Sequence, residues 1–154
     1  FNAISIMPSN LYGPNDNFTL ESSHVLAALI RKFNDAKENN TESITLWGDG
    51  SPYREFLHVH DLAEAAVFCM EEYDKGEIIN IGTGEDIQIK SLSSLISEIV
   101  GYNGKVLWDK TKPNGTHRKL LDTTKISSLG WKPKISLKDG IEDTYKWFIN
   151  NIEK

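Results

Sequence analysis

A cluster of polar residues follows the first strand-like run of the chain. Ser9, Asn10, Tyr12 and Asp16 all lie within residues 8–18. In α/β proteins, ligands bind where the strands of the sheet end, and hydroxyl, amide and carboxylate groups there can hold a polar ligand. The same residue types are also common in solvent-exposed loops that bind nothing. Composition alone therefore leaves both a ligand site and an ordinary surface loop open at this position.

Three histidines are candidates for acid–base or metal chemistry. His24 lies at the start of an expected helix, where it could act as a general acid or base near neutral pH. A half-exposed residue at a helix start is the alternative. His58 and His60 alternate on an expected strand beside Asp61, so they would share one face. That spacing could seat a metal ion, but no further ligands at structural-site spacing accompany the pair, and we expect no metal site.

Trp47 and Arg54 lie on either side of a glycine-rich turn at residues 48–52. If residues 44–47 pair with residues 53–57 as a hairpin, the indole and the guanidinium are cross-strand neighbours. An aromatic surface beside a bidentate cation suits a nucleotide base or a phosphate. A surface cation–π pair that stabilises the hairpin is the alternative.

A second group of cations lies in a loop that contains proline and glycine. Lys112, Arg118 and Lys119 occur within eight residues of one another in this loop. Their charges could converge on a diphosphate, or they could simply face solvent.

Gly82 and Gly84 follow an expected strand and look like the start of a dinucleotide-binding fingerprint. The third glycine of that fingerprint would fall at position 87, which is Ile87. We therefore reject this interpretation.

Elements that alternate along the chain must position these candidates. Hydrophobic periodicity predicts strands at 3–8, 44–47, 53–59, 78–81, 87–89 and 105–108, and helices at 24–38, 62–70, 92–100 and 137–152. Alternating strands and helices predict an α/β fold.

Capping signals set the expected helix ends. Ser22 and Ser23 can cap the first helix. Asp61 and Glu64 form a D-x-x-E capping pattern at the start of the second helix. Gly101 is expected to end the third helix, and Ser136 to cap the last.

Composition excludes several classes of protein. The 154 residues carry 17 basic and 22 acidic side chains, a formal net charge of −5, so no basic excess is available to neutralise a nucleic-acid backbone. No apolar run approaches the ~18 residues needed to span a bilayer, and no secretory signal opens the chain. The single cysteine, Cys69, fits a reducing compartment. We expect a cytoplasmic protein without nucleic-acid or membrane partners.

Taken together, the motifs resemble those of the GDP-L-fucose synthases, a family within the extended short-chain dehydrogenases/reductases. The resemblance covers nearly the whole chain in the same order. It rests on Pro8-Ser9-Asn10-Leu11-Tyr12-Gly13-Pro14 with Asp16-Asn17-Phe18, Ser23-His24-Val25, Trp47-Gly48-Asp49-Gly50, Arg54-Glu55-Phe56-Leu57-His58-Val59, Ile81-Gly82-Thr83-Gly84, and Lys112-Pro113-Asn114-Gly115-Thr116 with Arg118-Lys119-Leu120-Leu121-Asp122.

The resemblance implies an activity, a substrate and a cofactor. The family uses NADPH to convert GDP-4-keto-6-deoxy-D-mannose into GDP-L-fucose, by epimerisation at C3 and C5 and reduction at C4. It also implies that residues 1–154 form the C-terminal GDP-sugar-binding domain or fragment, with returning strands of a Rossmann-like sheet, and that the N-terminal NADP-binding part is absent. The whole enzyme would be a homodimer, formed through helices of the missing half, so a monomer is an open alternative for this part alone.

The resemblance also implies roles for individual residues. His24 looks like one of two acid–base groups, the other being a cysteine of the family, and Arg54 and Lys119 look nearest to the diphosphate. The implied cofactor-binding residues are Pro8, Ser9, Asn10, Leu11 and His24, and the implied substrate-binding residues are Asn10, Val25, Lys32, Trp47, Arg54, Lys105 and Lys119.

Parts of the family's machinery do not occur in this sequence. No tyrosine is followed by lysine four positions later, so the family's proton-donating Tyr-x-x-x-Lys pair is missing, as is its glycine-rich phosphate loop. Cys69 lies in a different segment from the family's acid–base cysteine. We therefore expect this chain to be inactive alone. Another extended-family nucleotide-sugar epimerase or dehydratase, and a non-catalytic nucleotide-sugar-binding module, are the alternatives.

Overall fold

Short strands alternate with helices along the chain. The structure is a computed structural model that describes residues 3–19 and 22–151, so Phe1 and Ile152 lie outside the described residues. The elements are β1 (Ile6–Pro8), β2 (Asn10–Tyr12), α1 (Val25–Glu38), β3 (Ser43–Trp47), β4 (Tyr53–Arg54), β5 (Phe56–His58), α2 (Val59–Glu72), β6 (Ile79–Ile81), β7 (Ile87–Gln88), α3 (Ile89–Val100), β8 (Lys105–Asp109), β9 (Arg118–Lys119), α4 (Thr124–Ser128) and α5 (Leu137–Asn151).

Most strand pairs are parallel. β1 pairs with β6, β2 with β5, and β3 with β8, all in parallel register. The short strand β4 lies between β7, to which it is antiparallel, and β9, to which it is parallel. Parallel pairs need crossovers, which the helices supply, so the expected α/β class is confirmed.

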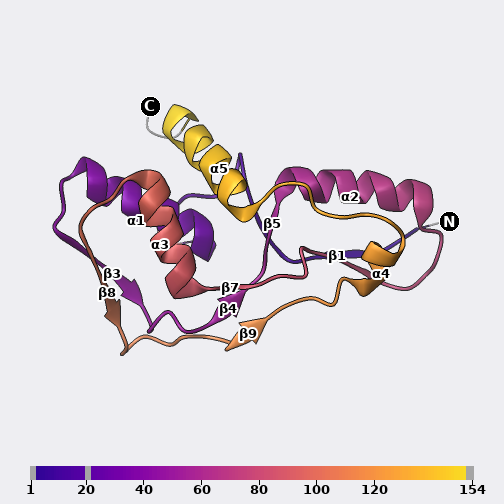
Figure 1. Ribbon diagram of the computed structural model, residues 1–154, viewed down its shortest axis with the longest axis horizontal. Coiled ribbons are helices and arrows are strands. Elements are labelled where there is room, and N and C mark those ends of the chain that lie inside the picture. The colour runs from indigo at the N-terminus through magenta and orange to yellow at the C-terminus, as the bar shows by residue number, and fades with distance from the viewer. Residues whose placement is uncertain (1–2, 20–21, 152–154) are drawn as a thin grey trace.

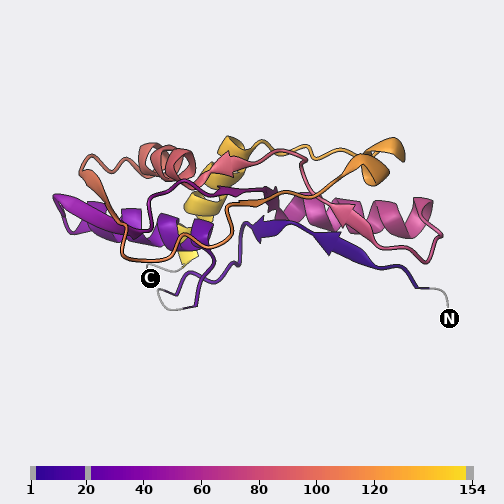
Figure 2. The ribbon, with the colours of Figure 1, turned by 90° about the horizontal axis from the view of Figure 1, so that it is seen from below.

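The molecule is elongated, with α1, α3 and α5 toward one end and α2 and α4 toward the other (Figures 1 and 2). Each group of helices contributes to its own hydrophobic core. One core packs α1, α3 and α5 against β3, and the other packs α2 and α4 against β6. Strand β5 contributes to both cores, because Phe56 packs in the core of α1, α3 and α5 and Leu57 packs in the core of α2 and α4. Successive side chains of a strand point to opposite faces, so this one strand joins the two halves.

The expected hairpin across the glycine-rich turn is wrong. Residues 43–47 pair in parallel with residues 105–109, and β4 pairs with β7 and β9 instead. Gly48 and Gly50 do turn the chain, at φ values of +78° and +75°. A turn changes the direction of the chain but does not require the segments on its two sides to pair, and β3 pairs along its five residues with β8.

Two expected helix starts are also wrong. The N-cap of α1 is His24, with no side-chain cap hydrogen bond, so neither Ser22 nor Ser23 caps it. Helix α2 begins at Val59, which places His60 in a helix instead of a strand. Its N-cap is His58, whose Nδ1 accepts from the backbone N–H of His60 at 3.3 Å.

Other end signals are confirmed. Gly101 ends α3 in the left-handed conformation at φ +78°. The Ser136 hydroxyl accepts from the Asp139 backbone N–H at 3.2 Å at the start of α5. No helix in the described part of the chain has the length and apolar character needed to cross a bilayer.

Candidate functional site

A pocket of about 400 Å³ lies against β2 and the start of α1. It is lined by Ser9, Asn10, Leu11 and His24, together with residues 12–16 and Val59. The structure thus brings residues 9–16, which follow β1, and the candidate acid–base residue His24 to the same cavity, although His24 lies 8 to 15 positions further along the chain. Pro8 ends β1 just before the pocket.

Strand pairing holds residues 9–12 in place against the neighbouring strands. Residues 10–12 form the strand β2, where the sequence suggested an uninterrupted loop. In the β2–β5 ladder Asn10 lies beside Phe56, and the Asn10 side-chain amide donates to the Glu55 carbonyl oxygen at 2.7 Å. The backbone N–H of Ser9 also donates to the Ile81 carbonyl at 2.9 Å. These contacts fix the orientation of the pocket wall from two neighbouring strands.

The pocket contains polar atoms without a protein partner. Among the described residues, the Ser9 hydroxyl and the Asp16 Oδ2 atom are buried and make no hydrogen bond. Burial raises the pKa of Asp16, while its backbone contact with Asn17 and the nearby His24 lower it. A buried polar atom without a partner is costly, so the pocket is suited to a polar ligand group. Composition placed Asp16 in this loop but did not single it out.

Trp47 stands at the exposed end of β3, with 67% of its surface accessible. Lys112 Nζ lies 5.6 Å from the centroid of its ring, so a cation–π pair does form, but its cation is Lys112 and not Arg54. The expected Trp47–Arg54 cross-strand pair fails together with the hairpin that would have made it.

Two loops nevertheless bring Trp47 and Arg54 to the same region. The Asn114 side-chain oxygen accepts from the Asp49 backbone N–H at 2.9 Å. A Cβ atom built on Gly115 would lie 3.5 Å from the Arg54 guanidinium. The loop before β9 therefore packs across the loop that links the two candidate residues.

Arg54 and Lys119 are neighbours in the register of β4 and β9. Arg54 donates to the Tyr53 carbonyl at 2.7 Å, and neither cation forms an ion pair with any described carboxylate. Arg118, one residue away, is instead paired with Asp86 at 2.5 Å. The sheet thus presents two adjacent cations with free charge, which suits a phosphate group.

Three other candidate residues lie apart from this pair. Val25 and Lys32 are seven residues apart on α1, which places them on one face of that helix. Lys105 begins β8, and Trp47 pairs with Asp109 at the other end of the same ladder. Four residues of strand separate the ends by about 13 Å, so Lys105 does not join the Trp47 region.

The expected shared strand face of His58 and His60 is wrong, because the two residues lie on different elements. Their ring centroids are 5.0 Å apart, and His58 Nε2 lies 3.6 Å from an Asp143 carboxylate oxygen. Burial lowers the pKa of His58. Across residues 3–19 and 22–151, no three potential ligands among His, Cys, Asp and Glu gather in a metal-binding arrangement.

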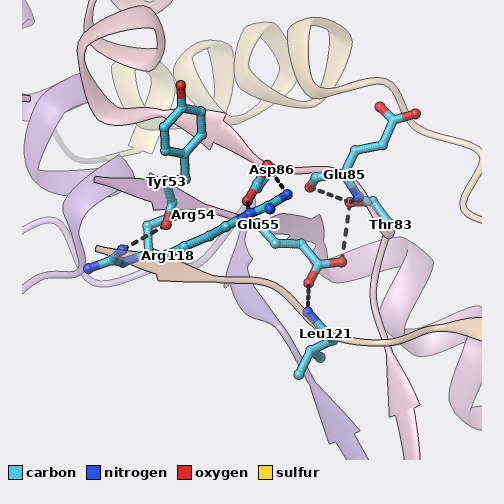
Figure 3. Close-up of polar contacts among 8 residues, drawn as sticks. All are labelled: Tyr53, Arg54, Glu55, Thr83, Glu85, Asp86, Arg118 and Leu121. Carbon is cyan, nitrogen blue, oxygen red and sulfur yellow. Dashed lines mark hydrogen bonds and ion pairs between the residues drawn. The ribbon is translucent and has the colours of Figure 1, made fainter. Parts of the chain in front are cut away.

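One acidic residue next to Arg54 was not singled out from the sequence. Glu55 is 1% exposed, and its carboxylate accepts hydrogen bonds from Thr83, Gly84 and Leu121. Figure 3 shows the bonds from Thr83 and Leu121. A charged residue inside a short apolar run was the available signal, because a buried carboxylate must be paired or hydrogen-bonded.

Comparison with known proteins gives consistent relatives. The NAD dependent epimerase/dehydratase family matches residues 1–82. The chain is 57% identical over 152 residues to a putative GDP-L-fucose synthase 2 of Arabidopsis thaliana, covering 99% of this chain and 46% of the relative. It is 45% identical to the GDP-L-fucose synthase of Escherichia coli K12, covering 97% of this chain and 50% of that protein.

Solved structures agree with these relatives. A GDP-L-fucose synthetase from Naegleria fowleri superposes with a TM-score of 0.92 at 30% identity, covering 98% of this chain and 47% of that one. A GDP-D-glycero-L-gluco-heptose synthase from Campylobacter jejuni gives 0.85 at 36% identity, covering 97% of this chain and 53% of that one. The chain spans about half the length of the relatives it matches. Because the family match covers more than half of the sequence, this chain belongs to the NAD dependent epimerase/dehydratase family.

Proposed function

We propose that this chain supplies the GDP-sugar-binding part of a GDP-L-fucose synthase. The observation that carries the proposal is 45–57% identity, over nearly the whole chain, to proteins named GDP-L-fucose synthase from plants and bacteria. In this proposal residues 1–154 form the C-terminal domain or fragment, and a homodimeric, cytoplasmic enzyme converts GDP-4-keto-6-deoxy-D-mannose into GDP-L-fucose.

The free cations support a diphosphate site. Arg54 and Lys119 adjoin in the sheet and lack carboxylate partners among the described residues, so an anionic group can satisfy both. Trp47, with its exposed indole, offers a surface for the guanine ring. Val25 and Lys32 on α1 are proposed as further substrate contacts. Lys105 is retained from the resemblance alone, because the ladder places it at the far end of β8.

His24 is proposed as the acid–base residue of the epimerisation. The 4-keto group of the substrate acidifies the protons on C3 and C5, so a base can remove one and an acid can return one to the opposite face. His24 lies at the pocket beside β2, where an imidazole can give and take protons near neutral pH. The required second acid–base group is not Cys69, which is fully buried in α2 and whose thiol pKa is raised by burial.

The same pocket suits one edge of an NADPH cofactor. The unpartnered Ser9 hydroxyl and the amide of Asn10 offer hydrogen-bonding groups, and Leu11 and His24 also line this pocket. Pro8, at the end of β1 just before the pocket, is proposed as a further cofactor contact from the resemblance alone. When bound, NADPH supplies the hydride that reduces C4. The residues of this chain orient the sugar and move protons.

The proposal predicts that this chain alone does not turn over its substrate. NADPH oxidation should be followed with GDP-4-keto-6-deoxy-D-mannose, with the Escherichia coli GDP-L-fucose synthase as a positive control. Turnover by this chain at a rate near that of the control would contradict the proposal that it supplies only the GDP-sugar-binding part of the enzyme. The product GDP-L-fucose should nevertheless bind the chain in calorimetry, and the absence of such binding would refute the substrate-binding assignment.

A second candidate function is that of a UDP-sugar epimerase. A UDP-glucose 4-epimerase from Thermotoga maritima superposes with a TM-score of 0.83 at 28% identity. The fold alone therefore accommodates a different nucleotide. Relative affinity for GDP and UDP separates the two candidates. A third candidate is a nucleotide-sugar-binding module without catalysis. The coding sequence upstream of this chain distinguishes it from an enzyme, because an enzyme requires a glycine-rich βαβ unit and a Tyr-x-x-x-Lys pair there.

A further inference from the structure

We propose that Glu55 is a positioning residue that sets Arg54 and Lys119 side by side for an anionic ligand. This inference rests on the proposed GDP-sugar function. Glu55 follows Arg54 directly and is buried at 1% exposure, so its carboxylate cannot itself meet a solvent-borne ligand. Its role must be exerted through the segments that it contacts.

The Glu55 carboxylate joins two segments that are distant in sequence (Figure 3). Oε1 accepts from the Gly84 backbone N–H at 2.8 Å and from the Thr83 hydroxyl at 3.3 Å, in the loop between β6 and β7. Oε2 accepts from the Leu121 backbone N–H at 3.0 Å, two residues after β9. Hydrogen bonds to a charged acceptor are stronger than those between neutral groups. One side chain thus anchors the chain segments on both sides of β4.

The anchoring matters because the strands involved are very short. β4, β7 and β9 contain two residues each, and a two-residue ladder specifies its register weakly. A slip of one residue between β4 and β9 would replace Lys119 beside Arg54 by Leu120 in one direction, which carries no charge, or by Arg118 in the other. Arg118 is already neutralised by Asp86, so the slip would remove one of the two free charges. Glu55 fixes the register just beyond the point where the ladder ends.

The close approach of the Glu55 carboxylate explains why the loop after β6 begins with a glycine, Gly82. A Cβ atom at this position would lie 2.3 Å from Glu55 Oε1 and 2.9 Å from its Cδ, so any side chain would displace the carboxylate. Residues 82–84, whose Gly-Thr-Gly sequence resembles the start of a dinucleotide fingerprint, therefore surround the Glu55 carboxylate. Gly82 leaves room for that carboxylate, and Thr83 and Gly84 donate hydrogen bonds to it.

A double-mutant cycle on GDP affinity tests the proposal with this chain. Glu55→Gln keeps the shape of the side chain but places an NH₂ group where one acceptor stood, so one donor loses its partner. We expect the Kd for GDP, measured by calorimetry, to rise about tenfold. In the Lys119→Ala background the same substitution should change the Kd by less than about twofold, because the register that Glu55 fixes decides whether Lys119 lies beside Arg54. A purely structural role would give similar losses in both backgrounds.

Controls separate failure of this inference from failure of the proposed function. Glu71→Gln removes an exposed acid on α2 and should leave GDP affinity unchanged. If Glu55→Gln does not fold, Thr83→Val decides. It removes one donor to Oε1, together with the contacts of the same hydroxyl to the Glu85 backbone, and should weaken GDP binding about threefold in a manner that depends on Lys119. Normal GDP affinity in a folded Glu55→Gln or Thr83→Val variant overturns the inference alone. Absence of GDP binding by the unchanged chain overturns the proposed function as well.

Discussion

Replacing Arg54 by alanine is expected to weaken GDP binding far more than the same change at Arg118. Both arginines lie on the β4–β9 pair, but their surroundings differ. Arg118 is engaged with Asp86, through contacts of 2.5 and 3.3 Å. Within residues 3–19 and 22–151, the acceptor of Arg54 is the Tyr53 carbonyl, so most of its donors are available to a phosphate.

The magnitude follows from the charge-assisted hydrogen bonds that Arg54 can make. A hydrogen bond to a charged group contributes about 1.5–3 kcal/mol, which corresponds to a rise in Kd of about 10- to 150-fold for Arg54→Ala. For Arg118→Ala we expect about threefold or less, since its charge is already compensated. Loss of the half-buried Arg54 cation should also reduce the salt dependence of GDP binding.

Calorimetric titration with GDP at low and moderate salt measures both quantities. Circular dichroism of each variant establishes that it is folded. Equal losses for the two arginine variants, or a Kd for folded Arg54→Ala within twofold of the unchanged chain, would refute the assignment of Arg54 as the diphosphate contact.

Three further predictions concern stability. Asp61→Ala should lower the free energy of unfolding by about 2–5 kcal/mol in urea titrations, because its buried carboxylate accepts from the backbone N–H groups of Lys134 and Ile135, both at 3.1 Å. Glu64→Gln, which removes only an exposed ion pair, should cost less than about 1 kcal/mol, and a comparable loss in both variants would contradict this account. Phe148→Ala should cost about 3–5 kcal/mol, because Phe148 is fully buried in the core of α1, α3 and α5; a loss below 1 kcal/mol would show that this core is not tightly packed. Burial lowers the pKa of His58, so the unfolded chain takes up a proton near pH 6.5 that the folded chain resists. The free energy of unfolding should therefore fall as the pH drops below about 6.5, and His58→Gln should weaken this dependence.

The helices with strong local signals could be predicted from the sequence. Helix α3 has a continuous apolar stripe and a terminal glycine, and α5 has a serine cap. Both signals act over a few residues, so a single sequence contains all the information they need. The sequence also placed a cluster of polar residues after the first strand, and several of them line the pocket beside β2. That a ligand binds there stays a prediction.

The strand partners could not be predicted in the same way. The turn at residues 48–52 has the composition of a hairpin, yet β3 pairs with residues 105–109, more than fifty positions away. Such a pairing is decided by the packing of distant elements, which local turn composition does not encode. Glu55 was missed for the same reason, because its partners Gly84 and Leu121 lie 29 and 66 positions along the chain.

The preference of this chain among nucleoside diphosphates tests the central proposal most directly. Calorimetric titrations with GDP, UDP and TDP, under one set of conditions, compare the same diphosphate with three different bases. A GDP-sugar-binding part predicts that GDP binds at least about tenfold more tightly than UDP or TDP, a difference of about 1.4 kcal/mol. Tighter binding of UDP or TDP, or equal binding of all three, would contradict the proposed function.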